Sequence, residues 1–312
     1  MKLLIMGTGP FAVPSFQALL QSSHEITGLI TRPDKLARGR KKAPPNPMRE
    51  AAEAANIDVE APDSINSAEG LAILERHAAD LFMVCDYGQI LSSEALSKSK
   101  LGGINLHGSL LPKYRGAAPI NWALLNGDSV AGITVIHMTP RLDGGPMLCQ
   151  RSLEVGPNEN AIELEPRLSQ IGVEAVLEAI AMLSEWDGKS EIGERQAKEL
   201  VTKAPRLKKS DGEIDWRQPA QQIHNQIRAL QPWPGTFTNL LREGKDPMRL
   251  IIKESQVLET SGSPGEARHT DEGIVVGCGQ NAILISRIQP AGKREMDSEE
   301  FVRGYGANLR FG

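Results

Sequence analysis

Short apolar runs alternate with amphipathic segments over the first half of the chain. Runs of four to eight apolar residues are typical of buried strands, and a 3.6-residue apolar spacing is typical of helices. Strands alternating with helices predict βαβ units and a mostly parallel, Rossmann-like sheet. The expected strands are 2–6, 25–30, 57–61, 80–85 and 102–108, and the expected helices are 45–56, 67–78 and the stretch after the loop that follows His107.

The pattern changes in the second half. Strands at 131–138 and 146–155 are separated by the turn "TPRLDGGP", so we expect them to pair antiparallel. A long amphipathic helix is predicted at 159–186, and the pattern fades from about 187 to 209, as in a linker. A helix at 219–230 then opens a glycine-punctuated region that predicts a small β-barrel. Its expected strands are 236–241, 249–259, 273–278 and 282–288.

Composition limits the class of protein. The 312 residues are 40% apolar and 24% charged, enough for packed cores and a polar surface. No apolar run reaches the roughly 18–20 residues needed to cross a bilayer, and the glycine- and proline-broken start does not resemble a signal peptide. The three cysteines, Cys85, Cys149 and Cys278, are odd in number and far apart. They favour a reducing cytoplasm and small buried side chains over disulfides or a metal site.

Charge is unevenly distributed. The net charge of −4 argues against a dedicated nucleic-acid binder. The stretch from Arg32 to Arg49, however, contains seven Lys and Arg residues and a single acid, Asp34. A local basic patch on an acidic protein can still bind a phosphate backbone.

The segment "GTGPFA", from Gly7 to Ala12, fits the first half of a dinucleotide fingerprint. The second half is missing, because Thr31 and Arg32 stand where an acid should meet a ribose. Pro10 also removes an amide that a phosphate would use. We therefore interpret the segment as a tight strand-to-helix turn whose amides can still bind some anion.

Asn105 and His107 lie two residues apart at a predicted strand end, so their side chains share one face. Asp143 lies in the glycine-rich turn at the mouth of the next strand. In an open parallel sheet, binding and catalytic sites lie beyond the carboxyl ends of the strands, where the three residues can meet. Each also has a structural interpretation: a capping Asn, a His bonded to a carbonyl, and a turn Asp.

The residues around this trio narrow the chemistry. No nucleophilic Ser or Cys stands beside the His, and no second carboxylate pairs with Asp143 as glycoside hydrolysis requires. The trio would then act on two bound substrates, an amine and an activated acyl group. An amide donor and the charged end of a second side chain would stabilise the oxyanion. An acid and a water molecule would move protons.

The stretch "NLHGSLLPKYRGAAPINWALLNGD", together with "DYGQIL" and "LDGG", resembles the 10-formyltetrahydrofolate-dependent transformylases. Three further segments are similar to the branch that acts on charged initiator tRNA: "TRPDKLARGRKK", "RALQPWPGTFT" and "IQPAGKREMDSEEFVRGY". The resemblance implies a catalytic domain at 1–187, a linker at 188–208 and an OB-like, tRNA-contacting domain at 209–312. We expect a monomer.

The resemblance also implies a reaction and a set of residues. The formyl group of 10-formyltetrahydrofolate would pass to the α-amine of methionyl-initiator tRNA, for bacterial-type translation initiation. Asn105 would polarise the formyl carbonyl, His107, oriented by Asp143, would stabilise the oxyanion, and Asp143 would move the amine proton. The implied folate contacts are Asp86, Tyr87, Gly88, Gln89, Ile90, Leu91, Ser109, Leu110, Leu111 and Pro112. The implied tRNA contacts are Arg38, Arg40, Lys41, Lys42, Lys208 and Lys209, and no metal is implied.

Two positions depart from the family pattern. Asp86 stands where the family usually has Ala, beside the expected folate pocket, and the basic loop is "ARGRKK" where "AGRGKK" is commoner. We predict that the Asp86 side chain faces water or the polar edge of the pterin.

Other functions stay open from the sequence. A formyltransferase acting on UDP-4-amino-arabinose would share the trio but lack the basic loop at 35–42. A glycinamide ribonucleotide transformylase would end near residue 200. An NADP-linked oxidoreductase would explain "GTGPFA" and Arg32, and an RNA-binding protein without catalysis would explain the loop.

Overall fold

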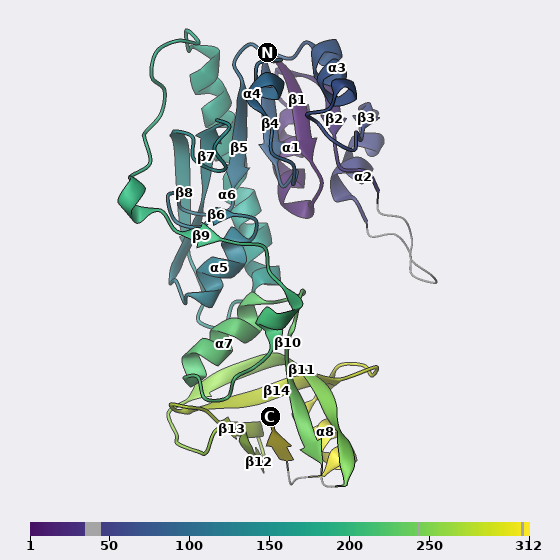
Figure 1. Cartoon of the computed structure of the whole chain (residues 1–312), viewed down its shortest axis with the longest axis vertical. Helices are drawn as coiled ribbons and strands as arrows, with labels where there is room; N and C mark the ends of the chain where they lie inside the picture. Colours follow the sequence, from purple (N-terminus) through teal and green to yellow (C-terminus); the bar gives the residue numbers. More distant parts are fainter. Residues whose placement is uncertain (35–44, 243, 307–308) are drawn as a thin grey trace. The chain divides into compact units, whose positions relative to one another are not determined.

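A computed structural model describes residues 1–34, 45–242, 244–306 and 309–312 (Figure 1). Within this part, no helix is long and apolar enough to span a membrane. The chain forms two compact units. Unit 1 comprises Met1–Pro119, Val130–Leu153 and Glu165–Pro205, and unit 2 comprises Ile120–Ser129, Glu154–Leu164 and Arg206–Gly312.

Unit 1 is built on a seven-stranded sheet with the order β3-β2-β1-β4-β5-β7-β8 (Figure 1). Strands β1 to β5 run parallel, and β7 pairs antiparallel with β5. The predicted β7–β8 hairpin is confirmed, since the His137 N–H donates to the Pro146 carbonyl where the two strands are joined. The strands are β1 Lys2–Gly7, β2 Glu25–Ile30, β3 Val59–Glu60, β4 Leu81–Cys85, β5 Gly103–His107, β7 Val130–His137 and β8 Met147–Glu154.

The central strands have continuous apolar sequences because helices cover the faces of a parallel sheet. All five residues of β4 are buried, and Leu4, Met6 and Phe82 lie in one core cluster with residues of the flanking helices. The mostly parallel sheet is therefore as predicted.

The predicted helices begin where a side chain can cap them. Asn46 accepts a hydrogen bond from the Arg49 N–H at the start of α2, and Ser67 accepts one from the Gly70 N–H at the start of α3. The helical segments up to residue 200 are η1 Pro10–Ala12, α1 Val13–Leu20, α2 Pro47–Ala54, α3 Ala68–His77, α4 Ser93–Leu96, α5 Pro119–Leu125, α6 Ala161–Ser184 and η2 Lys198–Leu200. Two short strands, β6 Arg115–Gly116 and β9 Lys203–Ala204, pair parallel.

Unit 2 contains the predicted barrel. The sheet order β11-β10-β16-β12-β13-β14-β15, with an additional β11–β14 pairing, closes six antiparallel strands into a ring. Trp216, Ile252, Ile285 and Phe301 lie in its core. Its elements are η3 Lys209–Gly212, α7 Ala220–Ala229, β10 Thr236–Arg242, β11 Lys245–Leu258, β12 Glu266–Thr270, β13 Gly273–Gly277, β14 Ala282–Pro290, β15 Met296–Asp297, α8 Ser298–Tyr305 and β16 Leu309–Phe311.

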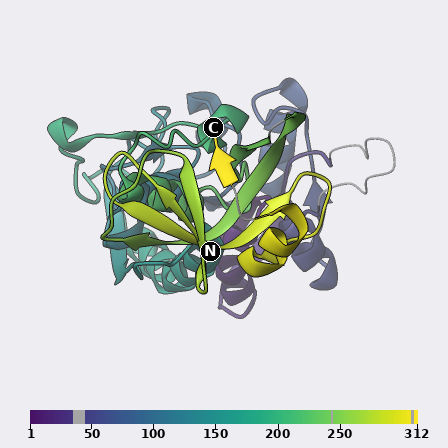
Figure 2. The ribbon, with the colours of Figure 1, turned by 90° about the horizontal axis from the view of Figure 1, so that it is seen from below.

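One element of unit 2 differs from the prediction. The sequence predicts strands and no helix after residue 230, but Ser298–Tyr305 form helix α8 (Figure 2). The helix buries Phe301 completely and stacks it on Tyr305, with ring centroids 4.6 Å apart. Its apolar positions, Phe301, Val302 and Tyr305, have helical spacing, but they are too few for the pattern to be distinguished from a strand.

Candidate active site

Strand β5 carries Asn105 and His107 in its carboxyl-terminal half, within the sheet of unit 1. Asn105 pairs with Val84 on β4 and with Ile136 on β7, and His107 pairs with Thr134. Residues two apart on a strand face the same side, as predicted. Asn105 is half-buried and His107 is buried. Among the residues that the structure describes, none forms a hydrogen bond with the Asn105 amide.

The hydrogen bonds of His107 define its tautomer. Its Nε2 lies 2.9 Å from the Tyr114 carbonyl oxygen. A carbonyl only accepts, so Nε2 carries the proton. Tyr114 has a φ of 64°, a left-handed conformation that accompanies this orientation of its carbonyl.

The other ring nitrogen faces Asp143. The Nδ1 atom of His107 lies 3.7 Å from Asp143 Oδ1, and both side chains are buried. This distance is too long for a direct hydrogen bond. A group beside the pair, and not between the two atoms, can form a hydrogen bond with each of them. A protonated imidazole would form an ion pair across the gap.

Asp143 is held in place by backbone. Its Oδ2 accepts a hydrogen bond from the Gly116 N–H at 2.9 Å. Gly116 has a φ of 137°, and a Cβ there would lie 2.3 Å from the Ala204 carbonyl oxygen, so the position requires glycine. The Asp-Gly turn therefore aims a carboxylate at His107, in addition to reversing the chain.

Gln196 links the two loops of the site and was missed by the sequence analysis. Its Nε2 donates to the carbonyls of Asp143 and Gly145, each at 2.8 Å. Its Oε1 accepts from Arg115 Nε at 2.9 Å and Nη2 at 2.6 Å. Gln196 lies in the segment interpreted as a linker, where no motif marks it.

Polar side chains on β7 and β8 fix the loop after His107. The buried Thr134 donates to the Ser109 carbonyl at 2.7 Å and accepts from the Leu111 N–H at 3.0 Å. Gln150 donates to the Leu111 carbonyl at 2.8 Å. Neither Thr134 nor Gln150 was predicted, because in sequence each is one more polar residue in a strand.

The residues expected to contact folate fall into two groups. The side chains of Tyr87, Leu91, Ser109 and Leu111 are buried. Gln89 is tied to the 62–65 segment by accepting from the Ile65 N–H at 2.9 Å. Asp86, Gly88 and Ile90 are exposed, and Leu110 and Pro112 are half-buried. Ile90 is 57% exposed and Leu142, beside Asp143, is 52% exposed.

Asp86 has an exposed side chain, as predicted, at a φ of 48° just after β4. Desolvation by the surrounding protein raises its pKa from 3.8 to about 6, and the charge of Arg32 and the Gly9 N–H partly oppose this. Solvent contact at the exposed carboxyl screens part of the effect. The pKa of the half-buried Glu165 is also raised, first by desolvation and then by the charge of Asp86.

A hollow of about 380 Å³ lies beside this segment and is lined by Arg32, Thr8 and six further residues. Arg32 packs over Gly88, where a Cβ would lie 2.9 Å from Nη1. The hollow includes none of the trio. Its remaining lining residues are Pro33, Asp34, Pro45, Asn46, Asp63 and Gln89.

The expected tRNA contacts are only partly described. Arg38, Arg40, Lys41 and Lys42 lie outside the described residues. Lys208 and Lys209 are exposed at η3 of unit 2. Within the described ranges, no group of three His, Cys, Asp or Glu side chains has a metal-binding arrangement. Cys85, Cys149 and Cys278 are buried and unpaired, as predicted.

Comparison with known families identifies the class of protein. The formyl transferase family matches residues 1–180, and the formyl transferase C-terminal domain matches residues 206–306. The chain belongs to the formyl transferase family.

Relatives narrow the class to methionyl-tRNA formyltransferases. One from Rhodopirellula baltica is 46% identical over 98% of this chain and 94% of its own length. One from Geobacter sulfurreducens is 40% identical over the same shares. Among solved structures, HypX from Aquifex aeolicus in complex with tetrahydrofolic acid superposes with a TM-score of 0.65 at 16% identity. The match covers 96% of this chain and 46% of HypX, so this chain spans about half of that protein.

Proposed function

We propose that this chain transfers the formyl group of 10-formyltetrahydrofolate to the α-amino group of methionyl-initiator tRNA. The observation that carries the proposal is the buried His107–Asp143 pair, with a 3.7 Å gap between Nδ1 and Oδ1 at the edge of the sheet. The methionyl-tRNA formyltransferase relatives support the choice of acceptor. Work on initiator tRNA would place the chain in the cytoplasm.

Asn105 and His107 act on the formyl oxygen. The Asn105 amide donates to it, which favours attack at the formyl carbon. His107, which faces Asp143, stabilises the negative charge that develops there. Preorganised donors of this kind contribute most when they are fixed before reaction, and the Tyr114 carbonyl fixes the imidazole.

Asp143 moves the proton of the attacking amine. Its Oδ2 is held by Gly116, while Oδ1 faces the gap next to His107. An amine or a water beside the pair, within hydrogen-bond distance of both atoms, would have the geometry that general acid–base catalysis requires. The proton lost by the amine passes through Asp143, with a water as carrier, toward the folate nitrogen that leaves.

The folate supplies an activated formyl group on N10 when it is bound. The exposed apolar side chains of Ile90 and Leu142 give its aromatic part a surface, and the loop 86–91 offers polar backbone groups beside them. These features fit an aromatic, partly polar co-substrate. Ser109, Leu110, Leu111 and Pro112 form the opposite side, pinned by Thr134 and Gln150.

The tRNA is bound by basic side chains away from the trio. The loop with Arg38, Arg40, Lys41 and Lys42 and the exposed Lys208 and Lys209 are the positions we assign to this role. In this scheme, residues 1–187 form the catalytic domain and residues 209–312 the tRNA-contacting domain, joined through 188–208.

Formyl transfer to charged initiator tRNA tests the proposal. The purified chain is incubated with 10-formyltetrahydrofolate and methionyl-initiator tRNA, and formylmethionine is measured after mild hydrolysis of the ester. Elongator methionyl-tRNA and UDP-4-amino-arabinose are the competing acceptors. Efficient transfer to initiator tRNA alone is expected, and transfer to the sugar nucleotide in its place would overturn the proposal.

A further inference from the structure

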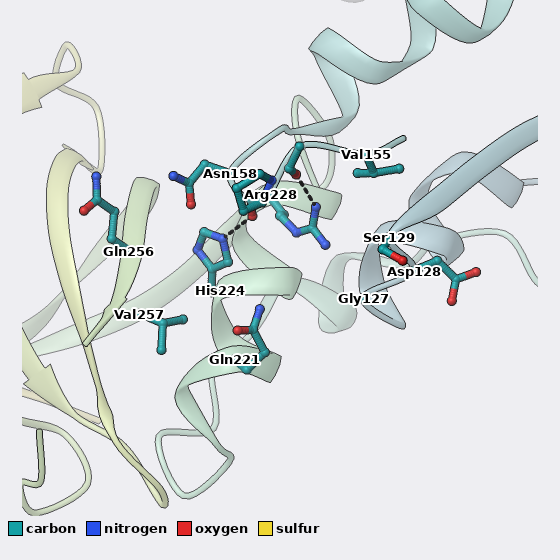
Figure 3. Close-up of a pocket in the computed structure, with 12 residues that line it drawn as sticks. Gly127, Asp128, Ser129, Val155, Asn158, Gln221, His224, Arg228, Gln256 and Val257 are labelled. Carbon is teal, nitrogen blue, oxygen red and sulfur yellow. Dashed lines mark hydrogen bonds between the residues drawn. The ribbon is translucent and has the colours of Figure 1, made fainter. Parts of the chain in front are cut away.

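A hollow of about 490 Å³ lies within unit 2, and the proposed reaction does not use it (Figure 3). Its walls come from the turn after α5, the segment after β8, helix α7 and strand β11. We call it the Arg228 hollow. This volume falls in the range of small-molecule sites.

Arg228 places a buried cation on the wall of this hollow. The residue is 6% exposed. Its Nε donates to Asn225 Oδ1 at 3.0 Å, and its Nη1 lies 3.4 Å and 3.3 Å from the carbonyl oxygens of Gly156 and Glu159. Within the described ranges, Nη2 has no hydrogen-bond partner and no carboxylate oxygen lies within 4 Å of the guanidinium.

A buried charge is costly when no opposite charge is in contact with it. Burial lowers the pKa of Arg228, and only the charge of Glu159 opposes this. An arginine nevertheless stays protonated in proteins. The guanidinium therefore offers its unused Nη2 donors to an anion in the hollow.

The wall beside Arg228 is rigid and electrically neutral. His224 is buried and accepts from the Ser255 hydroxyl through Nδ1, while Nε2 donates to the Pro157 carbonyl, each at 3.1 Å. Burial lowers the His224 pKa. The ring is therefore a neutral support that adds no second charge.

Four of the other lining side chains can donate hydrogen bonds. Amides of Asn158, Gln221 and Gln256 and the hydroxyl of Ser129 line the hollow. Asp128 is the one carboxylate among the described lining residues, and it points away from Arg228 in Figure 3. Asn225 Oδ1 accepts from both Gln221 Nε2, at 3.2 Å, and Arg228 Nε, so Gln221 and Arg228 belong to one polar cluster.

We propose that the Arg228 hollow binds a phosphate group carried on a larger molecule. A guanidinium donates to two oxygens of a phosphate at once, and the surrounding amides and hydroxyl can reach the others. The volume exceeds that of a bare ion, so the phosphate belongs to a nucleotide-sized molecule or to an RNA backbone. The site does not depend on the formyl transfer proposed above.

Two glutamines on α7 give a matched test. Gln221 lines the hollow, and Gln222 does not; both are exposed in the first turn of the same helix. Gln221→Glu places a negative charge in the Arg228 cluster, while Gln222→Glu adds the same charge outside it. Binding of inorganic phosphate, adenosine monophosphate and a short single-stranded RNA is measured by calorimetry at constant ionic strength. The full-length chain is used throughout.

Wild type should bind at least one probe saturably, and Gln221→Glu should weaken that binding by about tenfold or more, because like charges are brought together. Gln222→Glu should change it by less than about twofold, since exposed charges are screened. Arg228→Lys should also weaken binding. If that variant fails to fold, the comparison of Gln221→Glu with Gln222→Glu tests the proposal by itself.

The three probes distinguish the possible carriers of the phosphate group. Tighter binding of adenosine monophosphate than of RNA identifies a small phosphorylated molecule, and the reverse identifies an RNA backbone; both support the site. No saturable binding of any probe, or equal weakening by Gln221→Glu and Gln222→Glu, overturns it. Formyl transfer is assayed separately, so failure of one proposal leaves the other testable.

Discussion

His107 donates its Nε2 proton to the carbonyl of Tyr114, a residue in a left-handed conformation seven positions later. This bond turns the Nδ1 side of the ring toward Asp143, 3.7 Å away. A histidine with a backbone partner is often structural. Here that partner leaves the other nitrogen facing a buried carboxylate.

Asn105→Ala should lower kcat by about 10²–10³, because one preorganised donor to the developing oxyanion is lost. The side chain has no hydrogen-bond partner among the described residues, so the fold should be unaffected. Steady-state kinetics and a thermal melt check the two effects. Asn126→Ala, at an exposed position in unit 2, is the control. Near wild-type turnover would remove Asn105 from the catalytic group.

Asp143→Asn should lower kcat by about 10²–10⁴, the usual contribution of a positioned acid or base. The amide can still accept from Gly116 but loses the negative charge that faces His107. The shape of the pH–rate profile should change with the rate. A profile of unchanged shape and height would make Asp143 a turn residue.

Gln196→Met keeps most of the side-chain volume and removes the bonds to Arg115, Asp143 and Gly145. Two carbonyls and a guanidinium lose a partner, so we expect a loss of stability of about 1–3 kcal/mol. Because Gln196 acts through the Asp143 loop, kcat should fall by more than the donor KM changes. Gln222→Met, exposed on α7, is the control. Destabilisation without loss of kcat would limit Gln196 to a structural role.

Asp86→Asn tests the unusual carboxyl at the end of β4. The folded-state pKa is raised to about 6 from 3.8, so the folded protein binds this proton more tightly than the unfolded chain. The corresponding stabilisation is present below about pH 4 and is lost as the pH rises through about 6.

The variant should therefore be more stable than wild type at pH 8 and equal to it at pH 4. Because the side chain is exposed, the gain should stay below about 1 kcal/mol. Melting curves at the two pH values measure it, with the exposed Asp58→Asn as control. The donor KM should change by less than about tenfold with kcat unchanged, as for a ground-state contact. A stability gain that is the same at both pH values would exclude the titration of Asp86 as its source.

The mostly parallel sheet, the shared face of Asn105 and His107 and the approach of His107 to Asp143 were predictable. Continuous apolar strands and a strand-end position place side chains without knowledge of distant contacts. Gln196 and Thr134 were not predictable, because each acts by bonding to backbone from a segment far away in sequence. Helix α8 was missed because its few apolar residues draw their stability from packing on the barrel.

Arg38 and Arg40 carry the last prediction, which rests on the sequence. Residues 35–42, "KLARGRKK", hold five basic side chains and few apolar ones. If the loop contacts the tRNA backbone, each phosphate contact releases a counterion, and affinity falls with salt. Changing both arginines to Ala should weaken tRNA binding and flatten the slope of log K against log salt by roughly one to two units. Transfer to a methionyl ester, which has no phosphates, should be little affected because the trio lies elsewhere.

Lys208→Ala with Lys209→Ala gives the comparison in unit 2. An unchanged slope in the arginine variant, with a flattened slope in the lysine variant, would assign tRNA binding to η3 and not to the loop.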